Sequence, residues 1–229
     1  FGPVCGDPIG DGNPQHSGDG LCDDWKTYGI DYNGDGTIDY QLAPLGAKVG
    51  HHDLFVKVDY MSADQPDPAA LQDVVNAFAQ APVANGDGTS GVALHLLAGD
   101  ALPNVTQLHF ASPGVVPGDS FSDLKLGNNG AGLSEPCGTA PGAGHFGTAA
   151  ERADANCDNV IGAKSLVVRY AVFGNDLADQ PGSSGMADLG GSDLAVTVGS
   201  WNPATLRANG GLRLVEAGAF MHELGHTLG

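Results

Sequence analysis

The chain has 229 residues, of which 41% are hydrophobic, and its formal net charge is −18 at pH 7. This length and composition predict one globular domain, or one domain with a small appendage. They exclude a membrane span, because no apolar run approaches about 18 residues. They also exclude nucleic acid as a partner, because the 9 basic residues are scattered and form no patch for a phosphate backbone.

Aspartate dominates the acidic residues, with 23 Asp against 4 Glu, and glycine is abundant at 36 residues. Asp favours turns, helix caps and hard-cation sites over helix interiors. The composition therefore predicts a loop-rich fold that holds calcium. An acidic surface of the halophilic kind is the alternative, although such a surface is expected to use Glu as well.

The four cysteines, Cys5, Cys22, Cys137 and Cys157, form two local pairs, and neither pair has zinc-knuckle spacing. The even count and the start at Phe1 rather than Met favour a processed, exported protein. We therefore predict secretion, with disulfides that join Cys5 to Cys22 and Cys137 to Cys157.

Residues 1–47 contain few apolar side chains, so this segment needs a cross-link or a bound ion to be ordered. The predicted disulfide is one such stabilising feature. The second is a loop in which side chains that carry oxygen recur at alternate positions: Asp31, Asn33, Asp35, Thr37 and Asp39. We interpret residues 1–47 as a calcium-binding N-terminal segment.

The loop has further features of a calcium site. Gly36 stands where such a loop turns sharply, and the apolar Ile38 can hold it to its neighbours. Leu42 replaces the bidentate Glu of an EF-hand, so the loop resembles those of dockerins and thrombospondin type 3 repeats. Asp39, or an acid from residues 19–24, must then supply the missing charge. The alternative is a solvated Asn-Gly turn without a metal.

Packed α/β structure begins near residue 51. Residues 54–60 predict a central strand, which only Lys57 and Asp59 interrupt with charge. A helix follows at 68–80, with a Pro in its first turn, and then a strand at 92–97. The order strand, helix, strand predicts a parallel pair with a right-handed crossover.

The remainder of the sheet follows a long Gly-rich stretch, 100–163, that no pattern assigns. Strands are predicted at 165–173 and 193–199, with a short edge strand between them at 182–189. The sequence thus predicts a mixed, twisted sheet of four or five strands with flanking helices. We expect Lys57 and Arg169 to pair with neighbouring acids.

The last predicted element is a helix at 212–228. Its apolar stripe consists of Leu214, Ala217, Met221, Leu224 and Leu228.

This helix contains the run His222-Glu223-Leu224-Gly225-His226. Four residues are about one helical turn, so both imidazoles project from one face and can bind one zinc ion. Glu223 is rotated by about 100° from His222, which directs its carboxylate beside the metal. Zinc lowers the pKa of a bound water to about 7, and Glu223 can accept the proton of that water as general base.

Coincidence is a weak explanation of this motif. With 8 His and only 4 Glu in the chain, about 0.005 matches to H-E-x-x-H are expected by chance. The alternative is a pair of surface histidines without a metal. We expect five other histidines to be solvated or satisfied in the core, because they show no ligand spacing: His51, His52, His95, His109 and His145.

The run from His222 to Gly229 resembles the start of the metzincin signature H-E-x-x-H-x-x-G-x-x-H, with Gly229 at the position of the turning glycine. The order of predicted elements is also similar to the upper subdomain of metzincins, which we assign to residues 48–229. The resemblance implies a secreted zinc endopeptidase that holds protein or peptide substrates extended along an edge strand. Our candidate edge is at 185–189.

The signature ends here before its third ligand. We therefore expect a fragment of a longer product, in which the third ligand, the methionine turn and the specificity pocket follow Gly229. Two alternatives remain open. One is a non-catalytic, calcium-rich extracellular scaffold or adhesion protein that keeps a zincin-like domain, and the other is a gluzincin-type hydrolase with a downstream Glu as third ligand.

Overall fold

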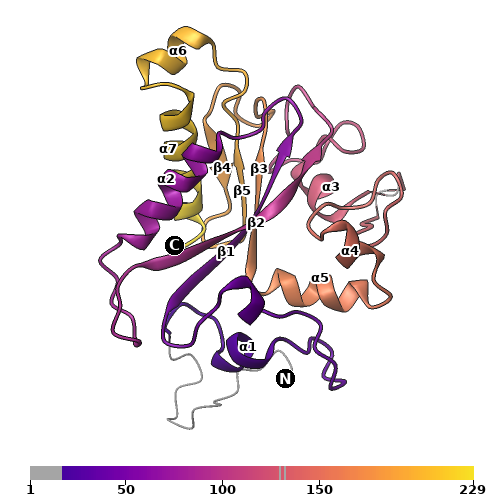
Figure 1. The fold of residues 1–229 in the computed structure, drawn as a ribbon. Helices are drawn as coiled ribbons and strands as arrows, with labels where there is room; N and C mark the ends of the chain where they lie inside the picture. Colours follow the sequence, from indigo (N-terminus) through magenta and orange to yellow (C-terminus); the bar gives the residue numbers. More distant parts are fainter. Residues whose placement is uncertain (1–16, 129, 132) are drawn as a thin grey trace. The chain divides into compact units, whose positions relative to one another are not determined.

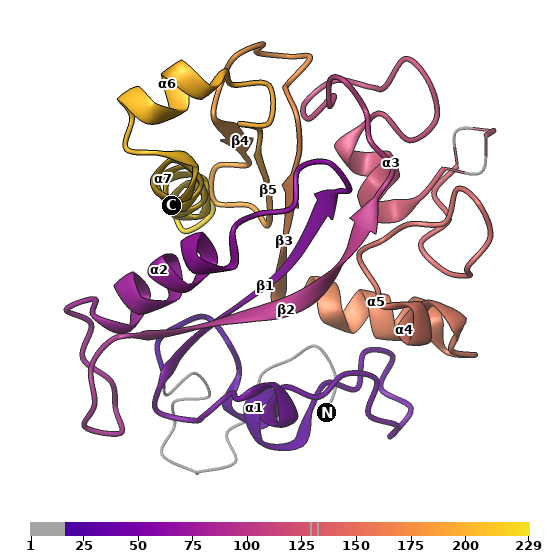
Figure 2. The same ribbon diagram turned by 45° about the horizontal axis from the view of Figure 1, so that its top comes forward.

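The computed structural model describes residues 17–128, 130–131 and 133–229, and its strands form a 5-stranded sheet in the order β2-β1-β3-β5-β4 (Figure 1). The strands are β1 (His52–Met61), β2 (Val92–Leu102), β3 (Val168–Phe173), β4 (Gly185–Ala187) and β5 (Asp193–Val196). Strand β3 is parallel to β5, and β4 is antiparallel to it. The arrows of β1 and β2 point the same way (Figure 2). The predicted mixed sheet with flanking helices is confirmed at this level.

Strand β1 is longer than the predicted 54–60, and every residue from 53 to 59 is buried. Its two interior charges satisfy one another, because the Lys57 ammonium donates to Asp59 and also, at 2.8 Å, to the carbonyl of His145. The Tyr170 hydroxyl donates to Asp59 at 2.6 Å. The expectation that Lys57 pairs with an acid is confirmed.

The predicted edge strand is also present. Strand β4 is the last strand in the sheet order, and Met186 pairs with Ala195 of β5. Strand β3 begins at Val168 rather than at 165, because Ser165 ends a helix that the sequence pattern did not indicate.

The described helices are α1 (Asp23–Tyr28), the 3-10 helix η1 (Ala43–Leu45), α2 (Pro68–Ala79), α3 (Phe121–Leu126), α4 (Ala149–Ala153), α5 (Cys157–Ser165), α6 (Pro203–Ala208) and α7 (Leu212–His226). The predicted helices at 68–80 and 212–228 are confirmed as α2 and α7. Helices α3, α4 and α5 fill the stretch that the sequence left unassigned. They are short, and short helices carry little hydrophobic periodicity.

The chain divides into two compact units. Unit 1 comprises the chain up to Val56 together with Val75–Leu96 and Asp154–Val168. Unit 2 comprises Lys57–Val74, Leu97–Ala153 and Arg169–Gly229. The predicted division between a calcium-binding segment 1–47 and a catalytic part 48–229 concerns function and stays a prediction.

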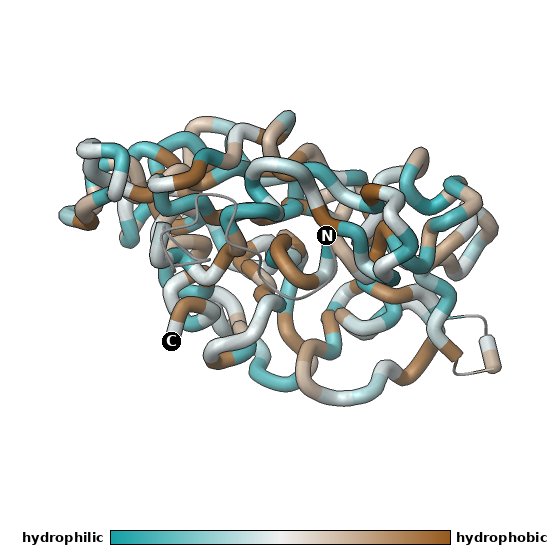
Figure 3. The backbone as a smooth tube through the Cα atoms, turned by 90° about the horizontal axis from the view of Figure 1, so that it is seen from below, coloured by the Kyte–Doolittle hydropathy of each residue, from teal (hydrophilic) through white to brown (hydrophobic). Residues whose placement is uncertain are grey.

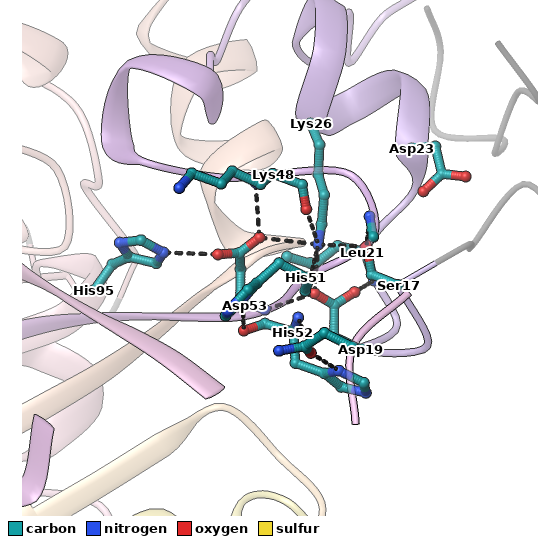
Figure 4. A network of polar contacts seen from close by, with 12 residues as sticks. Ser17, Asp19, Leu21, Asp23, Lys26, Lys48, His51, His52, Asp53 and His95 are labelled. Atoms are coloured by element: carbon teal, nitrogen blue, oxygen red, sulfur yellow. Dashed lines mark hydrogen bonds and ion pairs between the residues drawn. The ribbon is translucent and has the colours of Figure 1, made fainter. Parts of the chain in front are cut away.

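A buried ion network holds the first described residues of unit 1 to β1 (Figure 4). The Lys26 ammonium, on α1, donates to Asp19 at 2.6 Å and to Asp53 at 3.0 Å. It also donates to the Ser17 hydroxyl at 2.9 Å and to the His51 carbonyl at 2.7 Å. A buried ammonium with this many acceptors fixes the relative positions of the segments that supply them.

Asp53 is the second centre of the network. It accepts hydrogen bonds from the Lys48 amide at 2.9 Å and from the His95 ring at 2.8 Å, and the His95 ring stacks on Phe55 with centroids 4.5 Å apart. Burial alone raises the pKa of the Asp53 carboxyl, but the hydrogen bonds from His95, Lys48 and Lys26 outweigh it and hold that pKa below its ordinary value. Asp53 therefore remains ionised inside the unit.

The cysteines agree with the predicted pattern where it is described. A disulfide joins Cys137 to Cys157, as predicted. Cys22 is also disulfide-bonded. Cys5 lies outside the described residues, and so does the predicted bond between Cys5 and Cys22.

Hydrophobic and hydrophilic residues alternate over short distances along the backbone trace (Figure 3). In the described part of the chain, no helix has both the length and the apolar character that crossing a membrane requires.

Candidate metal centre and active-site helix

Helix α7 starts after two glycines with positive φ, Gly210 at 95° and Gly211 at 96°, a backbone region in which other residues are strained. The helix packs against β4 and β5 of unit 2. Its buried face includes Val215, Phe220 and Leu224. The face therefore differs from the predicted stripe.

Three apolar residues of the predicted stripe, spaced seven positions apart, are not buried. Leu214, Met221 and Leu228 are 60%, 47% and 50% exposed, whereas Ala217 and Leu224 are buried. The buried face of α7 is therefore shifted by roughly one residue around the helix axis from the predicted apolar stripe. The cause is Phe220, the large side chain that enters the core and packs on Phe173. This rotation leaves the histidines accessible.

His222 is exposed, His226 is half-buried, and their Nε2 atoms lie 3.0 Å apart. The ring centroids are 4.5 Å apart and the ring planes are nearly perpendicular, at 88°. Two nitrogens that bind one tetrahedral zinc ion at about 2.0–2.1 Å are themselves about 3.3 Å apart. The two Nε2 atoms thus lie within hydrogen-bonding distance of one another and at nearly the separation that a shared ion requires.

Glu223 is buried, with only 4% of its surface exposed. Burial raises the pKa of its carboxyl, and the neighbouring His222 and His226 act in the opposite direction. Strand β4 lies directly against it: a Cβ atom on Gly185 would be 2.7 Å from Glu223 Cγ and 2.8 Å from Oε1. The carboxylate is therefore held between the helix and the edge strand.

Polar contacts from β3 and from the loop after β4 fix the end of α7. The Arg169 guanidinium, on β3, donates to the Thr227 hydroxyl at 2.8 Å, and that hydroxyl donates to the Leu224 carbonyl at 2.7 Å. The Gly190 amide donates to the His226 carbonyl at 2.9 Å. The expectation that Arg169 pairs with an acid is wrong, since it bonds the helix end, where a cation interacts favourably with exposed carbonyls.

Gly229 follows this end with φ of 99°. Such a conformation strains any residue with a side chain.

The described residues bring two of the candidate zinc ligands together but do not complete a metal site. Over residues 17–128, 130–131 and 133–229, no group of three or more His, Cys, Asp or Glu side chains is arranged to hold a metal ion. A third zinc ligand is not among them.

The candidate calcium loop is built around Asp31, which is buried. Its carboxylate accepts three backbone N–H groups, from Gly34 at 2.7 Å, Asp35 at 3.1 Å and Gly36 at 2.8 Å. Gly34 and Gly36 have φ of 77° and 91°, which lets the chain wrap around this carboxylate. The loop is closed by a bridge between Ile30 and Tyr40.

The other candidate ligands lie along the same loop. Asp35 accepts from the Asn33 amide at 2.9 Å and from the Thr37 N–H at 2.8 Å. These hydrogen bonds, first from Asn33 and then from Thr37, hold the pKa of the exposed Asp35 carboxyl below its ordinary value. Asp39 turns back over the loop and accepts from the Tyr32 N–H at 2.8 Å.

Asp19 was one candidate for the missing calcium ligand, and the structure gives it another role. It accepts from Lys26 at 2.6 Å and from the Asp53 amide at 2.8 Å. Asp39, within the loop, and the buried Asp23 and Asp24 stay candidates for this ligand.

Four other histidines have hydrogen-bond partners of their own. His51 bonds the His52 carbonyl and His52 bonds Asn85; His95 bonds Asp53, and His109 bonds Ser112. His145 differs, because its Nδ1 atom is buried and has no hydrogen-bond partner among the described residues. Burial, followed by Arg152, lowers the pKa of this ring.

Sequence reasoning named Gly185 in the candidate edge strand and Arg169 as a base within a strand, but it did not place either residue beside the motif helix. Gly185 contacts the motif glutamate across the sheet edge, and Arg169 fixes the end of the motif helix. Both lie far from α7 in the sequence, so no local pattern linked them to the motif.

Comparisons with protein-family models, curated proteins and solved structures find no match for this chain.

Proposed function

We propose that this chain is the zinc-binding part of a secreted endopeptidase of the metzincin type. The observation that carries the proposal is the convergence of the His222 and His226 Nε2 atoms, 3.0 Å apart, on a helix whose Glu223 is buried beside them. Catalytic zinc sites use three protein ligands and a water. The metzincin signature puts the third ligand three residues after its glycine, which is Gly229 here.

When bound, zinc would polarise the scissile carbonyl and lower the pKa of a water molecule. Glu223 is the general base in this proposal. Its carboxylate holds the water and accepts a proton as the water oxygen bonds to the carbonyl carbon. The proton then passes to the leaving nitrogen, the C–N bond breaks, and the products are a carboxylic acid and an amine.

The outer edge of β4 is the proposed substrate track. Strand β4 is last in the sheet order, and its partner within the sheet is β5. An extended peptide can add to such an edge by backbone hydrogen bonds. Because Gly185 contacts Glu223, a peptide on this edge would lie next to the general base.

Two further parts of the proposal concern the surroundings. The disulfide between Cys137 and Cys157 supports an oxidising, extracellular location. The loop from Asp31 to Asp39 supports a bound calcium ion, since its oxygen-bearing side chains and glycine turns follow the pattern of calcium loops.

Zinc binding tests the ligand pair. The wild-type chain should bind zinc, and His222→Ala and His226→Ala should each weaken binding at least tenfold, whereas His51→Ala should not. Equal zinc affinity in all four proteins would reject the ligand assignment.

Casein cleavage tests the chemistry, in a protein that continues through the third ligand. Glu223→Ala should abolish cleavage while zinc stays near one equivalent, because the general base does not bind the metal. Unchanged cleavage would reject the mechanism. Zinc binding without any cleavage by the wild type would favour the non-catalytic scaffold.

A further inference from the structure

His226, one of the two zinc ligands of the proposed function, is the last residue of α7. Helix ends fray, because the last four carbonyl groups have no partner within the helix. His222 lies about one turn earlier, inside the helix. The 3.0 Å separation of the two Nε2 atoms therefore depends on what holds the last turn of α7 in place.

Thr227 directly follows His226 and links the last turn to β3. It is only 2% exposed, although Gly225 and Leu228 on either side of it in the sequence are exposed. Its hydroxyl donates to the Leu224 carbonyl at 2.7 Å and accepts from the Arg169 Nε at 2.8 Å. A hydroxyl can donate one hydrogen bond and accept others, so this one joins the helix end to the strand.

Arg169 makes these contacts with neutral acceptors. It is half-buried on β3, and its Nη2 atom donates to the Thr227 carbonyl at 3.4 Å. Within the described residues, no carboxylate forms an ion pair with it, and burial is the cause that lowers its pKa. A guanidinium in this place interacts favourably with the negative end of the helix and with its free carbonyl groups.

The loop between β4 and β5 holds the same turn from another direction. The Gly190 amide donates to the His226 carbonyl at 2.9 Å, and the Leu228 N–H closes the turn on the Gly225 carbonyl at 3.0 Å. These are backbone contacts, which a substitution does not remove. The contact between Arg169 and Thr227 uses side chains, so it can be removed without a change in the backbone.

We propose that Arg169 and Thr227 are positioning residues that hold His226 where it can share a zinc ion with His222. This role rests on the proposed function, since it needs His226 as a zinc ligand. The two residues act through the backbone of the last turn and do not bind the metal. Removal of groups that orient metal ligands typically weakens metal binding by about 10–100-fold.

The direction of the effect separates positioning from simple electrostatics. A guanidinium repels a nearby cation. If its charge alone mattered, removal of Arg169 would strengthen zinc binding. Positioning predicts the opposite, because the freed turn carries His226 away from the shared ion.

Zinc affinity, measured by competition with a coloured chelator, tests the proposal. Arg169→Gln and Thr227→Val should each weaken zinc binding by about tenfold. Thr227→Ser keeps the hydroxyl and should bind zinc as the wild type does. Because both residues act through one hydrogen bond, the double variant should bind zinc no more weakly than either single variant.

The matched control is Arg213→Gln. Arg213 lies in the first turn of α7 and donates to Asp73 at 2.6 and 2.7 Å, so its loss removes a charge from the same helix at the other end. It should leave the zinc affinity unchanged. In metal-free protein, amide hydrogen exchange at Thr227 and Leu228 should become faster in Arg169→Gln but not in Arg213→Gln.

Four outcomes decide between the explanations. Wild-type zinc affinity in Arg169→Gln and Thr227→Val, or unchanged exchange at the end of α7, would overturn the positioning role and leave the ligand pair standing. Equal weakening in Arg169→Gln and Arg213→Gln would also overturn it, as a general effect of charge. No zinc binding by the wild type would reject the proposed function and the positioning role together. If Thr227→Val fails to fold, Arg169→Gln gives the same readout from a less buried position.

Discussion

Gly185 of β4 and Glu223 of α7 are packed so closely that only a hydrogen atom fits on the Gly185 Cα between them. The same position faces β5, because the Ala195 carbonyl oxygen would lie 2.5 Å from a Cβ atom added to Gly185. The edge strand and the motif glutamate therefore constrain one another.

Gly185→Ala should displace either the glutamate or the edge strand. Overpacking of this kind costs about 1–3 kcal/mol, so urea unfolding should show lower stability, and cleavage should fall if the proposed mechanism holds. Gly218→Ala is the control, because Gly218 lies on an exposed part of α7 with no atom within 4 Å of its added Cβ. It should raise stability by up to about 1 kcal/mol. Equal stability of Gly185→Ala and wild type would contradict the contact.

Lys26→Met should destabilise the protein strongly. The substitution leaves Asp19 and Asp53 buried without their shared cation, and the loss of one partner of a buried pair costs about 3–5 kcal/mol. Lys48→Met removes a lysine whose side chain is exposed, and it should change stability by less than about 0.5 kcal/mol. Urea unfolding of the two variants distinguishes the network from a general effect of charge.

The pH dependence of stability should reveal the raised pKa of the Glu216 carboxyl. Its pKa is raised from 4.5 in the folded protein, so the folded state binds its proton more tightly than the unfolded state. Stability is therefore highest below the unfolded pKa and falls as the pH rises towards the folded pKa. In metal-free buffer, Glu216→Gln should flatten this fall. A pH profile that the substitution does not change would contradict the shift.

Asp35→Ala should lower the melting temperature in calcium and reduce the drop that a chelator causes in the wild type. Asp87→Ala is the control, because Asp87 stands in a similar turn and accepts from the Thr89 N–H at 2.9 Å, as Asp35 accepts from Thr37 at 2.8 Å. If both substitutions have the same effect, the loop is a turn without a metal.

The sequence predicted the helices and strands in which hydrophobic residues follow a regular pattern over many positions. The apolar run of β1 and the periodicity of α2 placed these elements to within about two residues. The zinc motif placed His222, Glu223 and His226 on one helix for the same reason, since four residues make one turn.

Contacts between distant residues could not be predicted in this way. Lys26 bonds residues 27 and 7 positions away, and Glu216 accepts from the Asp67 amide, 149 positions away. Short helices such as α3 depend on a local cap, where the Ser120 hydroxyl accepts from the Asp123 N–H at 3.0 Å. A single cap resembles many loop sequences, so the stretch 100–163 gave no assignment.

The bond between Cys137 and Cys157 turns the intervening stretch into a covalent ring. A protease that cuts once inside this ring leaves both halves attached, so the nicked molecule migrates as one band until a thiol is added. The protein can thus survive a cut there without losing a piece of the chain.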